Sequence, residues 1–154
     1  MTSERKQEYT RRISQANRTE IVVITFEIAL DYIQDARAAK DEASFTASVK
    51  KAKRCVEQLR DALDMNYAII SVPLSSLYNY VTHQMDRAVI KLDASQLDDC
   101  EMVLGNIHKA FKEVAKQDNS DPVMVNSEVV YRGFTYGKNG ANDSVSNFRR
   151  GVIA

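Results

Sequence analysis

Glycine and proline are scarce in this chain, with five glycines and two prolines among its 154 residues. A turn-rich β architecture uses both residues heavily, so their scarcity favours helices. No apolar run approaches the roughly 20 residues that a membrane-spanning helix needs. The N-terminal segment MTSERKQEYTRR is charged and has no signal-peptide core behind it. We therefore predict a cytoplasmic, helical protein without a membrane partner.

An excess of charge of either sign is also missing. Lysine and arginine together number 21, as do aspartate and glutamate, so the formal net charge is zero. A neutral chain gives no general reason to expect nucleic acid as a partner. The 44% hydrophobic content is that of an ordinary globular domain, and the length suffices for one self-sufficient core.

Residues that commonly carry catalysis or bind metals are few and scattered. Cys55 and Cys100 lack CxxC spacing and lie in apolar helical patterns, which predicts buried, reduced thiols rather than a disulfide. His83 and His108 fall in different predicted helices and form no ligand motif. In the segment GFTYGKNG, Asn139 stands where a phosphate loop needs serine or threonine. We expect no enzymatic activity, no metal and no cofactor.

Three segments carry apolar residues at steps of three and four. These residues are Phe45, Val49, Ala52, Val56, Leu59 and Leu63 in the first segment, Leu74, Leu77, Val81, Met85, Ala88 and Leu92 in the second, and Leu97, Cys100, Leu104, Ile107, Phe111 and Val114 in the third. Such stripes indicate amphipathic helices that pack at shallow angles. With a long helix before them, they predict an all-α protein, an antiparallel four-helix bundle.

Local signals predict where some of these helices begin. Ser44 is a candidate N-cap for the second helix, and Asp93 or Ser95 for the fourth. Pro73 is expected in the first turn of the third helix, where its missing donor costs nothing. The connection before it, DMNYAIIS, can add a helical turn at its two isoleucines.

The first long helix, over residues 19–39, is apolar around much of its circumference. One series contains Ile21, Ile24, Ile28 and Tyr32, and a second contains Val22, Phe26, Ala29, Ile33 and Ala36. A helix that faces one core needs a single stripe. We therefore expect this helix either to be central in the bundle or to have a second binding partner.

The sequence changes character near its C-terminal end. Residues 1–118 are predicted to form the helical bundle domain with a short N-terminal segment, and residues 119–154 an extended tail. The tail holds four of the five glycines and no long stripe. Val130, Phe134 and Tyr136 are spaced to lie on one side of an extended segment.

Several segments carry residue patterns that can be compared with a known protein family. The first is LSSLYNYVTHQM, in which Tyr80 lies off the apolar stripe. Its pattern L-x-x-L-Y-x-Y-V is formed by Leu74, Leu77, Tyr78, Tyr80 and Val81, followed by Met85 and Ala88. Segment 50–64, KKAKRCVEQLRDALD, ends in Leu-Asp, and segment 100–111, CEMVLGNIHKAF, contains Glu-x-Val-Leu. With Tyr9 ahead of the first long helix, these segments resemble in order and spacing the flagellar secretion chaperone FliS family. The resemblance covers residues 9–115.

The sequence departs from the family pattern at three places. Family members usually carry Ser-Pro at the start of the first long helix, where this chain has Asn17 and Arg18. Their Leu-Tyr-Asp-Gly-Ala-Ile is here the segment 25–30, TFEIAL, and their glycine-rich connection after Leu-Asp is the segment 65–68, MNYA. These changes affect the geometry of a groove at the first helix rather than the fold.

The resemblance implies a helical-bundle chaperone without enzymatic activity. Such a protein binds the disordered C-terminal segment of flagellin in the cytoplasm, blocks premature polymerisation and assists flagellar secretion. An export-gate protein or an anti-sigma factor is a further partner that the family implies.

Six residues are predicted to contact flagellin: Tyr9, Ile24, Phe26, Ile28, Tyr78 and Tyr80. Three of them, Tyr9, Tyr78 and Tyr80, match family positions, and Phe26 stands where the family has tyrosine. Ile24 and Ile28 follow from the excess apolar surface of the first long helix. Plain core packing is the alternative for each residue. Tyr9 is also predicted to cap the empty groove and to move aside for the client.

Two other functions fit the helical pattern. A helical adaptor or regulatory protein would present a flat apolar patch to another folded partner. A homodimeric bundle without flagellin activity would use the extra apolar face as its subunit interface.

Overall fold

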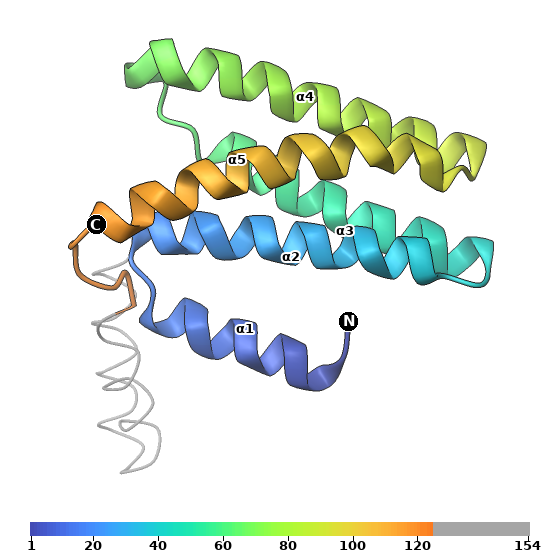
Figure 1. Ribbon diagram of the computed structural model, residues 1–154, viewed down its shortest axis with the longest axis horizontal. Coiled ribbons are helices and arrows are strands. Elements are labelled where there is room, and N and C mark those ends of the chain that lie inside the picture. The colour runs from blue at the N-terminus through green and yellow to red at the C-terminus, as the bar shows by residue number, and fades with distance from the viewer. Residues whose placement is uncertain (125–154) are drawn as a thin grey trace, which may run out of the picture.

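The computed structural model describes residues 1–124, and this part of the chain is helical. The long helices are α1 (Ser3–Gln15), α2 (Arg18–Ala38), α3 (Glu42–Asp61), α4 (Ala68–Lys91) and α5 (Leu97–Gln117). Two single-turn 3₁₀ helices, η1 (Met65–Tyr67) and η2 (Ala94–Gln96), precede α4 and α5. Helices α2 to α5 run in alternating directions, and α1 lies along the outer side of α2 (Figure 1). The predicted all-α bundle is confirmed, and residues 1–16 add a fifth helix that the sequence patterns did not predict.

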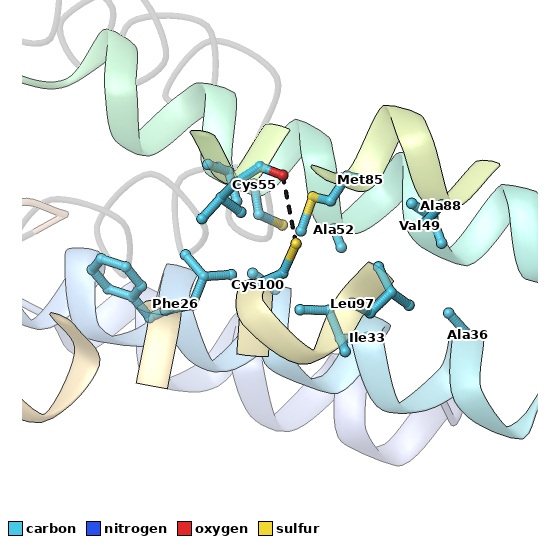
Figure 2. Packing of buried hydrophobic residues seen from close by; sticks show 14 of the residues in the cluster. Phe26, Ile33, Ala36, Val49, Ala52, Cys55, Met85, Ala88, Leu97 and Cys100 are labelled. Atoms are coloured by element: carbon cyan, nitrogen blue, oxygen red, sulfur yellow. Dashed lines mark hydrogen bonds between the residues drawn. The ribbon is translucent and has the colours of Figure 1, made fainter. Parts of the chain in front are cut away.

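One apolar core joins the four helices of the bundle (Figure 2). The predicted stripe of α3 is buried from Phe45 to Leu59. On α4 the buried face is rotated from the predicted one, because Tyr78 is 1% exposed whereas Leu77 is 39% exposed. The predicted stripe takes two successive steps of four, from Leu77 to Val81 and on to Met85, whereas Tyr78 lies seven residues before Met85 and therefore on the same side of the helix. On α5 the stripe has a strict 3.5-residue spacing and drifts off the buried face of a straight 3.6-residue helix, so Val114 near its end lies outside the core.

The predicted helix starts were wrong for α3 and α4. Asp41 rather than Ser44 caps α3, since its carboxylate accepts from the Ser44 backbone N–H at 2.7 Å. Helix α4 begins at Ala68, so Pro73 lies inside it. Proline leaves one helical carbonyl without its donor, and at this exposed end of the bundle water can replace it.

The prediction for the last helix was right in part. Asp93 caps η2 rather than α5, with its carboxylate accepting from the Ser95 backbone N–H at 2.9 Å. Leu92 ends α4 in the left-handed conformation, with φ at 52°.

Both cysteines are buried and free, as the sequence predicts. The Cys100 Sγ donates to the carbonyl oxygen of Val81 at 3.5 Å (Figure 2). Burial raises the pKa of Cys55 to about 11 and that of Cys100 to about 12. Both thiols therefore stay protonated and act as small apolar side chains in the core.

The predicted tail falls almost wholly outside the described residues. Only its first residues, 119–124, are described, and the candidate extended segment with Val130, Phe134 and Tyr136 is not among them.

Candidate functional site

Helix α2 buries two different faces. Phe26, Ala29, Ile33 and Ala36 lie in the main core between the bundle helices. On the other face, Ile24 forms a second buried cluster with Tyr9 and Ala16, and its partly buried neighbours are Met1, Ile13, Ile21 and Ile28. The two apolar series predicted on this helix therefore have largely separate partners. The series with Ile21, Ile24 and Ile28 faces α1, which we call the covering helix, whereas its Tyr32 packs on the main core.

The covering helix is held on α2 by polar contacts as well as by the small apolar cluster. The Met1 amine contacts Asp35 at 2.5 Å, Arg5 Nε donates to Asp31 at 2.8 Å, the Tyr9 hydroxyl donates to Asp31 at 2.5 Å, and Arg12 Nη1 donates to Glu27 at 2.5 Å. Residues later in α1 contact residues earlier in α2, so the two helices are antiparallel. The Arg5 guanidinium also lies 4.8 Å from the centre of the Tyr9 ring, within cation–π range.

The electrostatics of this face favour the docked covering helix near neutral pH. Burial and the hydrogen bond to Asp31 raise the pKa of Tyr9, so its phenol stays protonated. Burial pushes the pKa of Glu27 up, but the hydrogen bonds and charges of Arg12 and His108 together outweigh burial, and the pKa is lowered overall. A lowered pKa means that the Glu27 contribution is present above its ordinary value of 4.5 and is lost as pH falls through the lowered value.

An open cleft of about 510 Å³ lies where α1, α2 and α5 meet. Val23 and Ile24 line it together with charged side chains that include Arg12, Glu27 and Lys112. Because Ile24 and Glu27 also lie under the covering helix, the cleft continues the α1–α2 face rather than forming a separate site.

The junction between α1 and α2 is held by the segment that follows α5. Asn17 Nδ2 donates to the carbonyl oxygens of Asp118 and Ser120 at 3.2 and 3.5 Å, Thr19 Oγ1 donates to Asp118 at 2.5 Å, and the Val123 backbone N–H donates to the Ala16 carbonyl at 3.0 Å. Asn17 is also the N-cap of α2, with its side-chain oxygen accepting from the Glu20 backbone N–H. Asn17 thus replaces the usual serine as cap and adds two donors that a serine lacks.

Replacing Asn17 with alanine should lower the free energy of unfolding by about 1–2 kcal/mol, because a helix cap and buried hydrogen bonds are lost together. Asn17→Ser is the matched control, since serine keeps the cap but cannot donate to both carbonyls. Chemical denaturation measures the stability, and hydrogen exchange over residues 118–123 reports the junction. If both variants left exchange there unchanged, the Asn17 amide would not hold this segment.

The six predicted contact residues are divided among three places. Tyr9, Ile24 and Ile28 come together at the covering helix. Phe26 and Tyr78 lie in the main core, 0% and 1% exposed, with ring centroids 6.2 Å apart. Tyr80 is 41% exposed on α4, and its hydroxyl donates to Asp99 at 2.8 Å. The structure therefore brings three of the six residues into one face.

Two features of the surface were missed in the sequence. The carboxylates of Glu27, Asp31 and Asp35 form one row, and their spacing of four was the available signal. Helix η1 and the start of α4 expose a group of large apolar side chains: Met65, Tyr67, Ile69, Ile70 and Val72. Their segment was interpreted as a connection that can add a helical turn at its two isoleucines; α4 does contain both, but their exposure was not predicted.

The described part of the chain has no helix long and apolar enough to cross a membrane. Within residues 1–124, no group of three or more His, Cys, Asp or Glu side chains is arranged to hold a metal ion. The geometry that distinguishes this molecule is an apolar helix face that the covering helix buries through a small apolar cluster and ion pairs.

Comparison with known proteins agrees with this architecture. A search of curated protein sequences finds no match. The family model described as flagellar protein FliS matches residues 1–118, which include the covering helix and all four bundle helices. This is a family of chaperones that act in flagellar export, and it is not a family of enzymes. The match spans most of the chain, and the chain therefore belongs to the flagellar protein FliS family.

Proposed function

We propose that this protein is a cytosolic export chaperone for flagellin. It binds the disordered C-terminal segment of flagellin, blocks its premature polymerisation and assists its secretion. Family membership supports the general role. The structural observation that carries the proposal is the apolar face of α2 around Ile24, which the covering helix buries.

The covering helix is a polar one. In its sequence, SERKQEYTRRISQ, the large apolar side chains are Tyr9 and Ile13. A client helix with a fuller apolar face would bury more of Ile21 and Ile28, which the covering helix leaves partly exposed, and burial contributes roughly 25 cal/mol per Å². Such a client can replace the covering helix in the helix-in-groove mode of recognition. In the free protein, the covering helix keeps the apolar face out of water.

Other surfaces are available to a long client segment. Tyr80 is exposed, so its ring can contact a client without disturbing the core. The apolar side chains at the start of α4 are exposed as well. A segment that folds on binding commonly buries on the order of 1,000–3,000 Å², more than one helix face offers. We infer that the client contacts α4 in addition to α2.

Calorimetric titration with the C-terminal segment of flagellin from the same genome tests this function. We expect one-to-one binding with a negative heat-capacity change, because apolar surface is buried. Tyr80→Ala should weaken binding by about 5- to 30-fold if the ring is an interface anchor worth roughly 1–2 kcal/mol. Ile90→Ala is the matched control, since Ile90 is also exposed on α4 but near its opposite end.

Hydrogen exchange in the same complex reports the proposed displacement. Backbone amides of α1 should exchange faster once the client replaces that helix, while those of the bundle core stay protected. A folded protein that fails to bind the segment would contradict the proposed function. Concentration-dependent sedimentation of the free protein would instead support a homodimer that uses the apolar face as its interface.

A further inference from the structure

The apolar face of α2 has one acidic edge. Glu27, Asp31 and Asp35 follow one another at intervals of four residues, and neighbouring positions at this spacing lie on the same side of a helix. Their side chains are 20%, 31% and 34% exposed. Glu27 and Asp31 accept from the covering helix, and Asp35 accepts from the Met1 amine just ahead of it. We call these three residues the acidic row.

The covering helix shows what chemistry the acidic row accepts. The groups seated on it are the Met1 amine, the Arg5 and Arg12 guanidiniums and the Tyr9 hydroxyl. All of them are donors, and three of them are cationic. They occupy one edge of an antiparallel helix whose apolar side chains pack on Ile24 beside them. The face therefore combines an apolar strip around Ile24 with a line of carboxylates that accept charge-assisted hydrogen bonds.

Removing the covering helix leaves the acidic row without these partners. Like charges four residues apart on a helix repel each other, and partly buried carboxylates without donors carry a desolvation cost. A purely apolar replacement would cover the apolar residues but leave Asp31 and Asp35 without these donors and Glu27 with His108 at 3.4 Å. A replacement with acidic side chains along the same edge would add repulsion. The row thus discriminates among amphipathic helices by the charge of one edge.

We propose that the α2 face selects an amphipathic client helix with a basic edge. The client lies antiparallel to α2, with its apolar residues over Ile21, Ile24 and Ile28. Arginine, lysine or hydroxyl side chains at spacings of three or four meet the acidic row. This inference rests on the proposed function, in which a client replaces the covering helix, and it adds the chemistry by which the client is recognised.

A pair of synthetic helical peptides tests the selection on the full-length protein. Both peptides carry the same apolar residues, and they differ only in having arginine or glutamate along one edge. We expect the basic-edged peptide to bind about tenfold more tightly, since three partly exposed ion pairs each contribute modestly. The ratio should shrink as salt is added, because salt screens these charges. Fluorescence anisotropy measures both affinities.

The ratio of the two affinities reports the contribution of the acidic row separately from the cost of releasing α1. Both peptides must displace the same covering helix, so the cost of displacing it cancels in the ratio. Asp31→Asn, which keeps the shape of the side chain, should reduce the preference, and Asp31→Arg should reduce it further, because two carboxylates of the row remain. Asp61→Arg is the matched control, because it makes the same charge change at an exposed position at the end of α3. Circular dichroism verifies that each variant is folded.

The outcomes separate this inference from the proposed function. Equal binding of both peptides, or tighter binding of the acidic-edged one, would overturn the charge selection. If neither peptide bound while the flagellin segment did, the inference would fail and the proposed function would stand. If the basic-edged peptide bound and the flagellin segment did not, the inference would stand and the proposed client would be wrong.

Discussion

Replacing Phe26 with alanine is expected to lower the free energy of unfolding by about 3–5 kcal/mol, the usual loss for a fully buried phenylalanine. Phe26 is 0% exposed, and its ring lies between those of Tyr78 and Phe111, with centroid distances of 6.2 and 5.7 Å. Alanine would leave a cavity that these neighbours cannot fill without shifting. Urea denaturation followed by circular dichroism measures the loss.

Ile90→Ala serves as the control for Phe26→Ala. Ile90 is 81% exposed, and truncation of an exposed side chain usually changes stability by less than about 0.5 kcal/mol. A loss below about 1 kcal/mol for Phe26→Ala would mean that this ring does not anchor the core. The expected large loss has a consequence for binding studies. Weaker flagellin binding by Phe26→Ala would report a damaged core, and it would not identify Phe26 as a client contact.

Replacing Tyr9 with alanine is expected to tighten client binding by about tenfold or more, because apparent affinity rises with the fraction of molecules whose binding face is open. Tyr9 is 3% exposed and is the largest apolar side chain of the covering helix. Its loss removes packing on Ile24 and the hydrogen bond to Asp31. Hydrogen exchange should show that α1 is released while α2 to α5 keep their protection.

The sign of the Tyr9 effect distinguishes two roles. If Tyr9 covers the face, its removal tightens binding. If Tyr9 itself contacts flagellin, as the family pattern also predicts, its removal weakens binding. Tyr9→Phe provides the intermediate case, since it keeps the ring and loses only a hydrogen bond worth about 1 kcal/mol.

Tyr9→Phe and the natural sequence can also be compared as a function of pH. The folded pKa of Tyr9 is raised above its ordinary value of 10.0 by burial and by the hydrogen bond to Asp31. The contribution of its hydroxyl is therefore fully present below pH 10 and is lost as pH rises toward the folded pKa. Release of α1 at alkaline pH should be weaker in Tyr9→Phe than in the natural sequence. Equal alkaline release in both proteins would assign it to another group.

The stripes on α3 and α5 were readable in the sequence because each of these helices buries one side against the bundle. Apolar residues therefore repeat along the sequence with nearly the period of the helix. The two apolar series on α2 were also readable, and so was the question of what covers the series with Ile21, Ile24 and Ile28. Tyr78 was harder to place. It lies seven residues, about two turns, before Met85 and shares its buried side, but the predicted stripe stepped by four from Val81 back to Leu77 instead of by three to Tyr78.

Residues 1–16 show where sequence patterns cannot decide. SERKQEYTRRISQ carries too few apolar residues to indicate an amphipathic helix. It is helical next to α2, where Tyr9 and Ile13 gain an apolar surface and the arginines gain carboxylates. Short helices gain most of their stability from tertiary packing rather than from propensity. The same holds for Asn17, whose amide finds acceptors about one hundred residues away in sequence.

For this protein, the sequence by itself determined the helical class, the bundle, the buried thiols and the family, because these depend on periodicity and on local residue order. Only the tertiary structure decided which apolar residues form the main core and which lie beneath the covering helix. Both groups bury the same kinds of side chain, so composition cannot separate them. What separates them is whether the covering element belongs to the bundle, as around Phe26, or rests on its surface through a thin apolar seam and a row of ion pairs, as α1 does over Ile24.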